Sequence, residues 1–165
     1  INLVLSKGES MKSNENSTIH WLGVTSLVTL LLAVPVAIAN DIERAVDYRQ
    51  GVMNIFSWNM KAMGSMMKGE VPFDQKAFAL HASDLAGTAT LNLLPGFPED
   101  SESDESDALP EIWMEFDDFE KKYQNLGRLT KALSEVAASG DKTALSKALE
   151  KTGKACKACH KKYKN

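Results

Sequence analysis

Apolar residues recur at steps of three and four along the chain from Asn40 onward, and no stretch keeps up an alternation of apolar and polar residues. Steps of three and four place side chains on one face of a helix, whereas a strand needs a period of two. The spacing predicts helices over residues 41–68, 74–94, 110–139 and 142 towards the chain's end. An antiparallel four-helix bundle buries four such faces with short connections, so the predicted fold class is all-α.

The predicted helices have boundary residues that favour a start or a stop. An aspartate precedes three of them, where its carboxylate can accept hydrogen bonds from the free N–H groups of the first turn. A glycine follows two of them, because glycine readily adopts the left-handed conformation that ends a helix. Prolines stand at two further boundaries. These residues are Asp41, Asp74, Asp141, Gly69, Gly140, Pro95 and Pro110.

One segment breaks the helical pattern between the second and third predicted helices. It carries a run of acidic residues interleaved with serines. Such a composition buries too little apolar area to offset the entropy lost on ordering the chain, which predicts an exposed loop. Its acidic residues are Glu99, Asp100, Glu102, Asp104, Glu105 and Asp107.

The first 39 residues have the features of a targeting segment. Met11 is the apparent start, and an apolar run follows over residues 21–38. The run is marginal in length for a membrane span, and Pro35 suits a processing site better than a spanning helix. We therefore predict upstream residues and a signal peptide cleaved after Ala39, an exported bundle at 40–165, and no stable membrane insertion. An uncleaved anchor is the alternative.

The charge balance narrows the class of partner. The net charge is −3 and the pI is near 5.6. The four charged residues before Asn40 cancel one another, so the predicted exported part keeps the same net charge. This balance gives no reason to expect nucleic-acid binding or a polybasic membrane patch. The expected partners are a small ligand and other proteins.

The two cysteines of the chain are Cys156 and Cys159, and His160 follows directly. Residues three apart on a helix share a face, so these thiols can reach both vinyl groups of one haem and the adjacent imidazole can reach its iron. A zinc site needs about four ligands, and the one other histidine after Asn40 is His81. A redox dithiol usually opens a helix after a strand. The motif therefore favours one covalent haem c with His160 as an axial iron ligand.

The opposite face of the iron needs a residue from upstream, because only five residues follow His160. Met53 is the leading candidate, one helical turn after Arg49 on the same predicted face. A stripe of methionines is more often adaptable core than ligand. Arg49 can either extend to solvent or hold a carboxylate such as a haem propionate. His81 is expected on the exposed or half-buried side of the second helix, away from the iron.

The chain from Asn40 to its end resembles the cytochrome c′ family, the class II c-type cytochromes. The resemblance implies a four-helix bundle, commonly a homodimer, in the periplasm. It also implies His160 on the proximal side of the iron and an apolar side chain, here Met53, over the distal haem face. The matching segments are 48–50 with Met53, 68–74, 110–113 and 156–164.

Four further positions carry roles that the resemblance implies. Arg49 and Gln50 are expected at the haem edge and its propionates, and Asp107 at the haem from the loop between helices. Lys164 is expected to flank the proximal imidazole. The loop is more acidic than the family pattern, and its proline segment is reduced to residues 94–97.

Three functions fit these residues. The first is a five-coordinate, high-spin haem protein that transfers electrons and binds nitric oxide and carbon monoxide. The second is a low-spin electron carrier with Met53 as the sixth ligand, whose thioether raises the reduction potential. The third is a peroxidase-like enzyme, but the sequence offers no polar distal acid or base for it. We predict the first function, no enzyme activity, and a redox partner protein that the sequence does not identify.

The first predicted helix has more apolar positions than one buried stripe needs. Val52, Ile55 and Met66 lie beside the stripe assigned to the haem. A second apolar face on one helix can pack against the same helix of another copy, so we predict a homodimer.

Overall fold

The structure is a computed structural model that describes residues 34–165, with side chains from Asp41 onward. The chain divides at Asn40, and Asn40–Asn165 forms one compact unit. The predicted start at Met11 and residues 21–33 of the predicted apolar run at 21–38 lie outside the described residues. No helix within the described part is both long enough and apolar enough to span a membrane.

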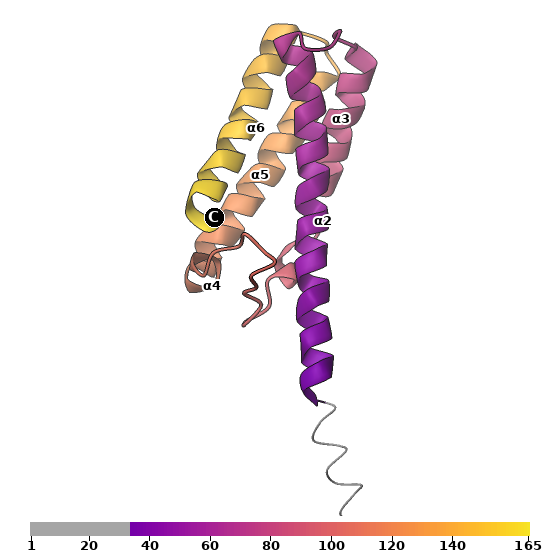
Figure 1. Cartoon of the computed structure of the whole chain (residues 1–165). Coiled ribbons are helices and arrows are strands. Elements are labelled where there is room, and N and C mark those ends of the chain that lie inside the picture. The colour runs from indigo at the N-terminus through magenta and orange to yellow at the C-terminus, as the bar shows by residue number, and fades with distance from the viewer. Residues whose placement is uncertain (1–33) are drawn as a thin grey trace, which may run out of the picture. The chain divides into compact units, whose positions relative to one another are not determined.

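The compact unit is a four-helix bundle, as the helical spacing predicted. Four long helices run alternately up and down, and the chain's end lies at the same end of the bundle as α4 (Figure 1). The elements are α2 (Val34–Lys68), α3 (Gln75–Thr88), the 3₁₀ turn η1 (Leu94–Gly96), α4 (Glu111–Met114), α5 (Phe116–Ala137) and α6 (Lys142–Tyr163). The described residues contain no strand, apart from one isolated bridge between Ala108 and Lys164.

Two of the predicted aspartate caps are confirmed. Asp74 accepts hydrogen bonds from the backbone N–H groups of the first turn of α3 at 2.8 and 3.0 Å. Asp141 does the same for α6 at 2.9 and 3.3 Å. Gly69 and Gly140 follow α2 and α5 with φ of +76° and +75°, the left-handed conformation that glycine adopts without strain.

Two predicted boundaries are wrong. Helix α2 begins at Val34, not beside Asp41, because the residues before Asp41 continue the helix. Helix α3 ends at Thr88, six residues before the predicted end. Its last turn tightens there, since Thr90 N–H bonds to Gly87 O at 3.1 Å, and the chain then leaves the helical path.

The third predicted helix is two helices. Glu115, with φ −129° and ψ 44°, separates α4 from α5. No glycine or proline marks this break in the sequence. Its partners lie elsewhere in the chain: Trp113 Nε1 donates to Pro98 O at 2.8 Å, and Lys162 Nζ donates to the Glu115 carboxylate at 2.6 Å. Contacts to the loop and to α6 therefore set the angle of α4.

All four long helices contribute to the core. Each contributes side chains that are at most 1% exposed: Met63, Phe78, Leu85, Leu133 and Leu145. Leu93, just before η1, is also fully buried. Removal of these apolar side chains from water is the main source of the stability of the fold.

The prediction that Val52, Ile55 and Met66 form a dimer face on α2 is partly wrong. Val52 and Met66 are buried, at 3% and 8% exposed, and belong to the core of the bundle. Ile55 is 45% exposed, and Trp58, one turn later, is 71% exposed. The outward apolar face of α2 therefore includes Ile55 and Trp58 but neither Val52 nor Met66.

Candidate haem-binding site

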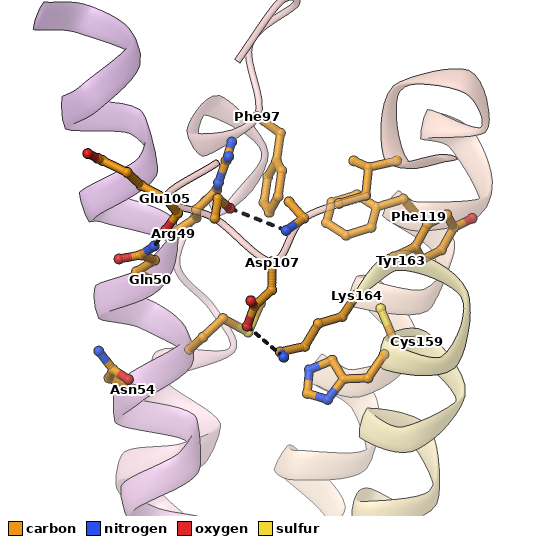
Figure 2. Close-up of a pocket in the computed structure, with 15 residues that line it drawn as sticks. Arg49, Gln50, Asn54, Phe97, Glu105, Asp107, Phe119, Cys159, Tyr163 and Lys164 are labelled. Atoms are coloured by element: carbon orange, nitrogen blue, oxygen red, sulfur yellow. Dashed lines mark hydrogen bonds and ion pairs between the residues drawn. The ribbon is translucent and has the colours of Figure 1, made fainter. Parts of the chain in front are cut away.

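A cavity of about 330 Å³ lies between α2, the loop before α4 and the last turns of α6. This volume is within the range of small-ligand pockets in proteins. Figure 2 shows Arg49 and Gln50 on the α2 side and Cys159 and Tyr163 on the other, with Asp107 and Lys164 between them. Seven of the eight predicted site residues line it: Arg49, Gln50, Met53, Asp107, Cys159, His160 and Lys164.

The attachment motif lies in the last two turns of α6. Cys159 and His160 line the cavity, whereas Cys156, one turn earlier, does not. Both thiols are free and half-buried, and burial raises the pKa of each. Partial burial, together with the positive charge of Lys164, lowers the pKa of His160. A neutral imidazole beside two reduced thiols is the state that ligation of haem requires.

Arg49 is buried on α2, at 2% exposed, so the interpretation that it extends to solvent is wrong. Its Nη1 donates to Gly96 O and to Ser101 Oγ at 3.0 Å, and its Nη2 donates to Ser101 O at 2.8 Å. The guanidinium also lies 4.9 Å from the Phe97 ring centroid and 5.7 Å from that of Trp113. Burial lowers the pKa of Arg49, but a guanidinium stays charged at neutral pH.

One donor of Arg49 is left over. Its Nε is buried and has no hydrogen-bond partner among the described residues, although Arg49 lines the cavity. A buried donor on a charged group costs free energy unless an acceptor reaches it. A carboxylate such as a haem propionate brings both the acceptor and the opposite charge. The residues present therefore fit a ligand with an acidic edge.

The acidic loop is tied to the end of α6 by main-chain hydrogen bonds. Leu109 N–H donates to Tyr163 O at 3.1 Å, and Asn165 N–H donates to Asp107 O at 2.9 Å. The acidic side chains of the loop are exposed, as predicted. Ser101 is not: it is fully buried because Arg49 binds both its hydroxyl and its carbonyl. The loop is thus fixed at three points and is not uniformly exposed.

Side chains extend this connection across the cavity. Gln50 Nε2 on α2 donates to Glu105 O at 2.6 Å, and Lys164 Nζ lies 2.7 Å from the Asp107 carboxylate (Figure 2). The loop is therefore bonded to α2 on one side and to the end of α6 on the other. Because Asp107 and Lys164 are exposed, the ion pair between them contributes little stability.

The cavity wall is largely apolar. Met53 on α2 is half-buried, and the sequence interpretation of Met53 as a core-facing residue agrees with its contact with the buried cluster. Three aromatic rings adjoin one another: Phe97 and Phe119 at 4.8 Å between centroids, and Phe119 and Tyr163 at 5.5 Å, both edge to face. Ile112 from α4 completes this wall. An apolar wall favours neutral ligands over anions.

A polar cluster beside the cavity holds the last turn of α6. Asp118 on α5 accepts hydrogen bonds from Tyr163 OH at 2.7 Å and from Lys162 Nζ at 2.9 Å. These two bonds lower the pKa of Asp118 to about 2. Tyr163 is buried at 3% and lines the cavity, so Asp118 fixes a wall of the site without lining it.

Sequence reasoning missed several of these partners. Nothing in the sequence marks Ser101, which looks like one more loop serine, as the residue that binds Arg49. Asn54 also lines the cavity, and its position four residues after Gln50 was the signal that could have found it. His81 is half-buried and bonds to Asn59 Oδ1 at 2.9 Å, away from the cavity, as predicted. Within residues 41–165 no group of three or more His, Cys, Asp or Glu side chains is placed to hold a bare metal ion.

Comparison with known proteins gives one consistent result. The family model described as Cytochrome C' matches residues 44–164. A relative, cytochrome c-554 of Cereibacter sphaeroides, is 34% identical over 145 residues, which cover 84% of this chain and 94% of the relative.

Solved structures agree with the sequence match. Cytochrome c prime from Shewanella frigidimarina has a TM-score of 0.72 and 33% identity, over 75% of this chain and 96% of that one. The nitric oxide complex of a mutant of cytochrome c prime from Alcaligenes xylosoxidans has a TM-score of 0.68 and 31% identity, over 75% and 95%. The family match covers nearly all of the compact unit, and the helical bundle and the Cys-x-x-Cys-His motif at its end agree with that match. The chain therefore belongs to the cytochrome c′ family and is a c-type haem protein with covalently attached haem c.

Proposed function

We propose that the protein transfers electrons and binds small gases at a five-coordinate, high-spin iron in the periplasm. The observation that carries this proposal is that His160, at the end of α6, and Met53, on α2, line the same cavity. Haem c supplies a redox-active iron with one coordination position open to a gas. The side chains around the cavity attach the group, hold its edge and cover its open face.

Attachment falls to the end of α6. Cys156 and Cys159 would form the two thioether bonds, and His160 would supply a nitrogen ligand to the iron. We expect the double variant Cys156→Ala, Cys159→Ala to release its haem into acidic organic solvent, whereas the wild type keeps it. Ala158→Ser is the matched control, because it changes the same motif and leaves both thiols; it should keep its haem. A double variant that retained haem through extraction would place the attachment elsewhere.

The edge of the haem is held from α2 and from the loop. Arg49, with one unpaired donor and a full positive charge, and Gln50 bind the propionates. Asp107 contacts the haem from the loop. Lys164, paired with Asp107 and close enough to lower the pKa of His160, flanks the proximal imidazole. Lys164→Gln should therefore change the iron–histidine stretching frequency in resonance Raman spectra of the ferrous protein. Lys161→Gln, an exposed neighbour on α6, should leave it unchanged.

Met53 covers the distal face as a steric gate. Its thioether is flexible, and the neighbouring wall is apolar, so the side chain can turn a methyl group towards a ligand without bonding iron. Met53→Ala should speed binding of carbon monoxide and nitric oxide with little change in the resting spectrum. Met60→Ala is the control, since Met60 lies two turns along α2 against Gly153 and does not line the cavity. The solved nitric oxide complex of a relative supports gas binding as the role to test.

The second candidate is a low-spin electron carrier with Met53 as the sixth ligand. The same observation favours it, because Met53 lines the cavity and a half-buried thioether is a suitable iron ligand. An absorption spectrum of the reduced protein separates the two. A sharp, intense α-band that is lost in Met53→Ala would establish ligation by Met53, whereas a broad high-spin spectrum that shifts with carbon monoxide supports the gas-binding function.

We propose no enzyme activity for this site. Peroxidase-like chemistry needs a distal acid and base to assist cleavage of the O–O bond. The α2 wall carries two amides, Gln50 and Asn54, the permanently charged Arg49, and Met53. None of these exchanges a proton near neutral pH. Turnover of hydrogen peroxide with a dye substrate should therefore stay at the level of free haem.

The proposed location is the periplasm, reached by a signal peptide cleaved after Ala39. N-terminal sequencing of the haem-containing protein from a periplasmic extract should begin at Asn40. The expected protein stays in the supernatant after ultracentrifugation. A haem-stained band that pelleted with membranes at the full-chain mass would instead support the uncleaved anchor.

We also propose a homodimer, with a changed face. Ile55 and Trp58 on α2 are exposed at 45% and 71%, and Leu80 on α3 is exposed at 58%. When a partner covers exposed apolar side chains of this size, the free energy of the system falls. Light scattering at micromolar concentration should give twice the mass of the haem-containing chain, and Trp58→Glu should give the single mass. A wild-type protein at the single mass would contradict the proposal.

A further inference from the structure

The exposed side of α6 carries a strong positive charge that the haem site does not use. The helix contains seven lysines and one glutamate, whereas the whole chain has a net charge of −3. Seen along the helix axis, five of the lysines lie within an arc of about 120°, because successive residues of an α-helix are about 100° apart. We call these five the lysine face, and all are exposed: Lys147, Lys151, Lys154, Lys157 and Lys161.

The charges of the lysine face are mostly not neutralised from within the protein. Lys154 pairs with Glu150 of the same helix. No ion pair is recorded for Lys147, Lys151, Lys157 or Lys161 among residues 41–165. Structural lysines of this protein behave differently, since Lys162 binds both Glu115 and Asp118. The lysine face therefore presents mostly unpaired positive charge to the solvent.

The lysine face lies close to the residues that attach the haem. Cys156, Cys159 and His160 lie on the other side of the same helix, within its diameter of about 10 Å. A protein that docks on the lysine face therefore lies one helix away from the attached haem. The acidic loop is bonded to α2 and to the residues just after α6, so the lysine face continues along α6 away from it. A row of like charges attracts a partner surface of opposite charge and raises its association rate.

We propose that the lysine face is the docking surface for an electron-transfer protein with an acidic surface around its own redox centre. Charge complementarity selects this occupant. A membrane-surface helix needs apolar side chains beside its basic ones, and none of the exposed large apolar side chains within residues 41–165 lies on α6. The net negative charge of the chain disfavours nucleic acid. The inference rests on the proposed electron-transfer function and names the chemistry of its partner.

Reduction of the ferric holoprotein by a reduced plant-type ferredoxin, a small acidic one-electron donor, tests the proposal. One electron leaves the reduced [2Fe–2S] cluster, which becomes oxidised, and ferric haem iron becomes ferrous, with no proton exchanged. We expect the second-order rate constant of the wild type to fall about tenfold or more between about 10 and 200 mM salt. The variant Lys151→Glu, Lys161→Glu should lose about tenfold at low salt, and the difference should vanish at high salt.

The matched control changes the net charge by the same amount elsewhere. Lys61 on α2 and Lys76 on α3 are exposed and lie outside α6. Lys61→Glu, Lys76→Glu should keep the wild-type rate within about threefold. Equal losses in the two double variants would show that only net charge matters and would overturn the docking surface. The arginine variant Lys151→Arg, Lys161→Arg should keep the wild-type rate, because it keeps the charges.

Two further results separate the possible failures. An equilibrium redox titration of the wild type tests electron transfer by itself, and the absence of a reversible one-electron step would remove the proposed function. A normal titration with a ferredoxin rate that does not depend on salt would overturn the docking surface alone. Vesicles of phosphatidylglycerol should not bind the protein at physiological salt. Binding to them that the Lys151→Glu, Lys161→Glu variant loses would assign the face to a lipid surface instead.

Discussion

The two ends of the bundle are built by different means. At the end opposite the cavity, helices begin and end on signals within a few residues: Gly69 and Asp74 between α2 and α3, and Gly140 and Asp141 between α5 and α6. At the cavity end, Arg49 bonds to Ser101, 52 residues further along the chain. Local chemistry forms the first end, and long-range hydrogen bonds form the second.

This difference has a functional consequence. A connection set by local signals is a short turn, closed after α2 by bonds such as that from Glu70 N–H to Ser65 O at 3.0 Å. The longer connection before α4 is bonded to α2 at Ser101 and Glu105 and to the chain after α6 at Asp107, and the cavity beside Cys159 and His160 is bordered by these contacts. The site therefore lies where the chain depends on distant partners for its conformation.

Arg49→Met breaks the cavity end and should have the largest effect. It leaves Gly96 O, Ser101 O and Ser101 Oγ without their donor in a buried place, so we expect a loss of about 3 kcal/mol in the free energy of unfolding. Urea unfolding of the ferric holoprotein measures it. Arg44→Met, which removes an exposed arginine on the same helix, should change stability by less than about 0.5 kcal/mol. Similar losses in both would contradict the role of Arg49.

Gly140→Ala breaks the opposite end through the backbone alone. The φ of +75° is strained for any residue with a Cβ, and the new Cβ would lie 3.3 Å from the Gln75 side chain. We expect a loss of about 1.5 kcal/mol. Gly51→Ala is the opposite case, because Gly51 is inside α2 with open space around it, and it should gain about 0.5 kcal/mol. Thermal unfolding of both variants under one buffer checks the pair.

Asp141→Ala removes the cap at the same end, with a smaller effect. Two backbone N–H groups of α6 donate to the Asp141 carboxylate, and in the variant they would bind water instead, which costs about 1 kcal/mol of stability. Asp47→Ala serves as the control, since Asp47 is exposed inside α2 and caps no helix, and it should stay within about 0.5 kcal/mol. Denaturant midpoints at constant slope report both variants, and an equal loss for Asp47→Ala would remove the cap as the explanation.

Asp118→Asn gives the smallest effect and sharpens the comparison through pH. Bonds from Tyr163 and Lys162 lower the pKa of Asp118 from 3.8 to about 2, so the unfolded chain binds more protons between these values. The contribution of this carboxylate is present above about pH 4 and is lost as the pH falls towards 2. The variant should show a flatter decline of stability in this window, measured by urea unfolding at a series of pH values. Asp117→Asn, an exposed neighbour, should keep the wild-type slope.

The site was predictable where the chemistry of the residues themselves marks their role. Cys-x-x-Cys-His predicts its haem wherever the helix lies, and the spacing of Arg49 and Met53 placed both on one face of α2, where both now line the cavity. Ser101 was not found, because a serine in a loop has no chemistry that marks it, and Asn54 was marked only by its position one helical turn after Gln50. Their roles come from the segment that packs against them.

The sequence by itself determined the helices, two of the aspartate caps, the glycine ends and the attachment motif, because each depends on residues within a few positions of one another. Only the tertiary structure decided that Val52 and Met66 are buried, that Glu115 separates α4 from α5, and that Ser101 is covered by Arg49. These features depend on which surfaces meet when four amphipathic helices pack. One helix does not contain that information, since burial of a face is a property of the pair that forms it.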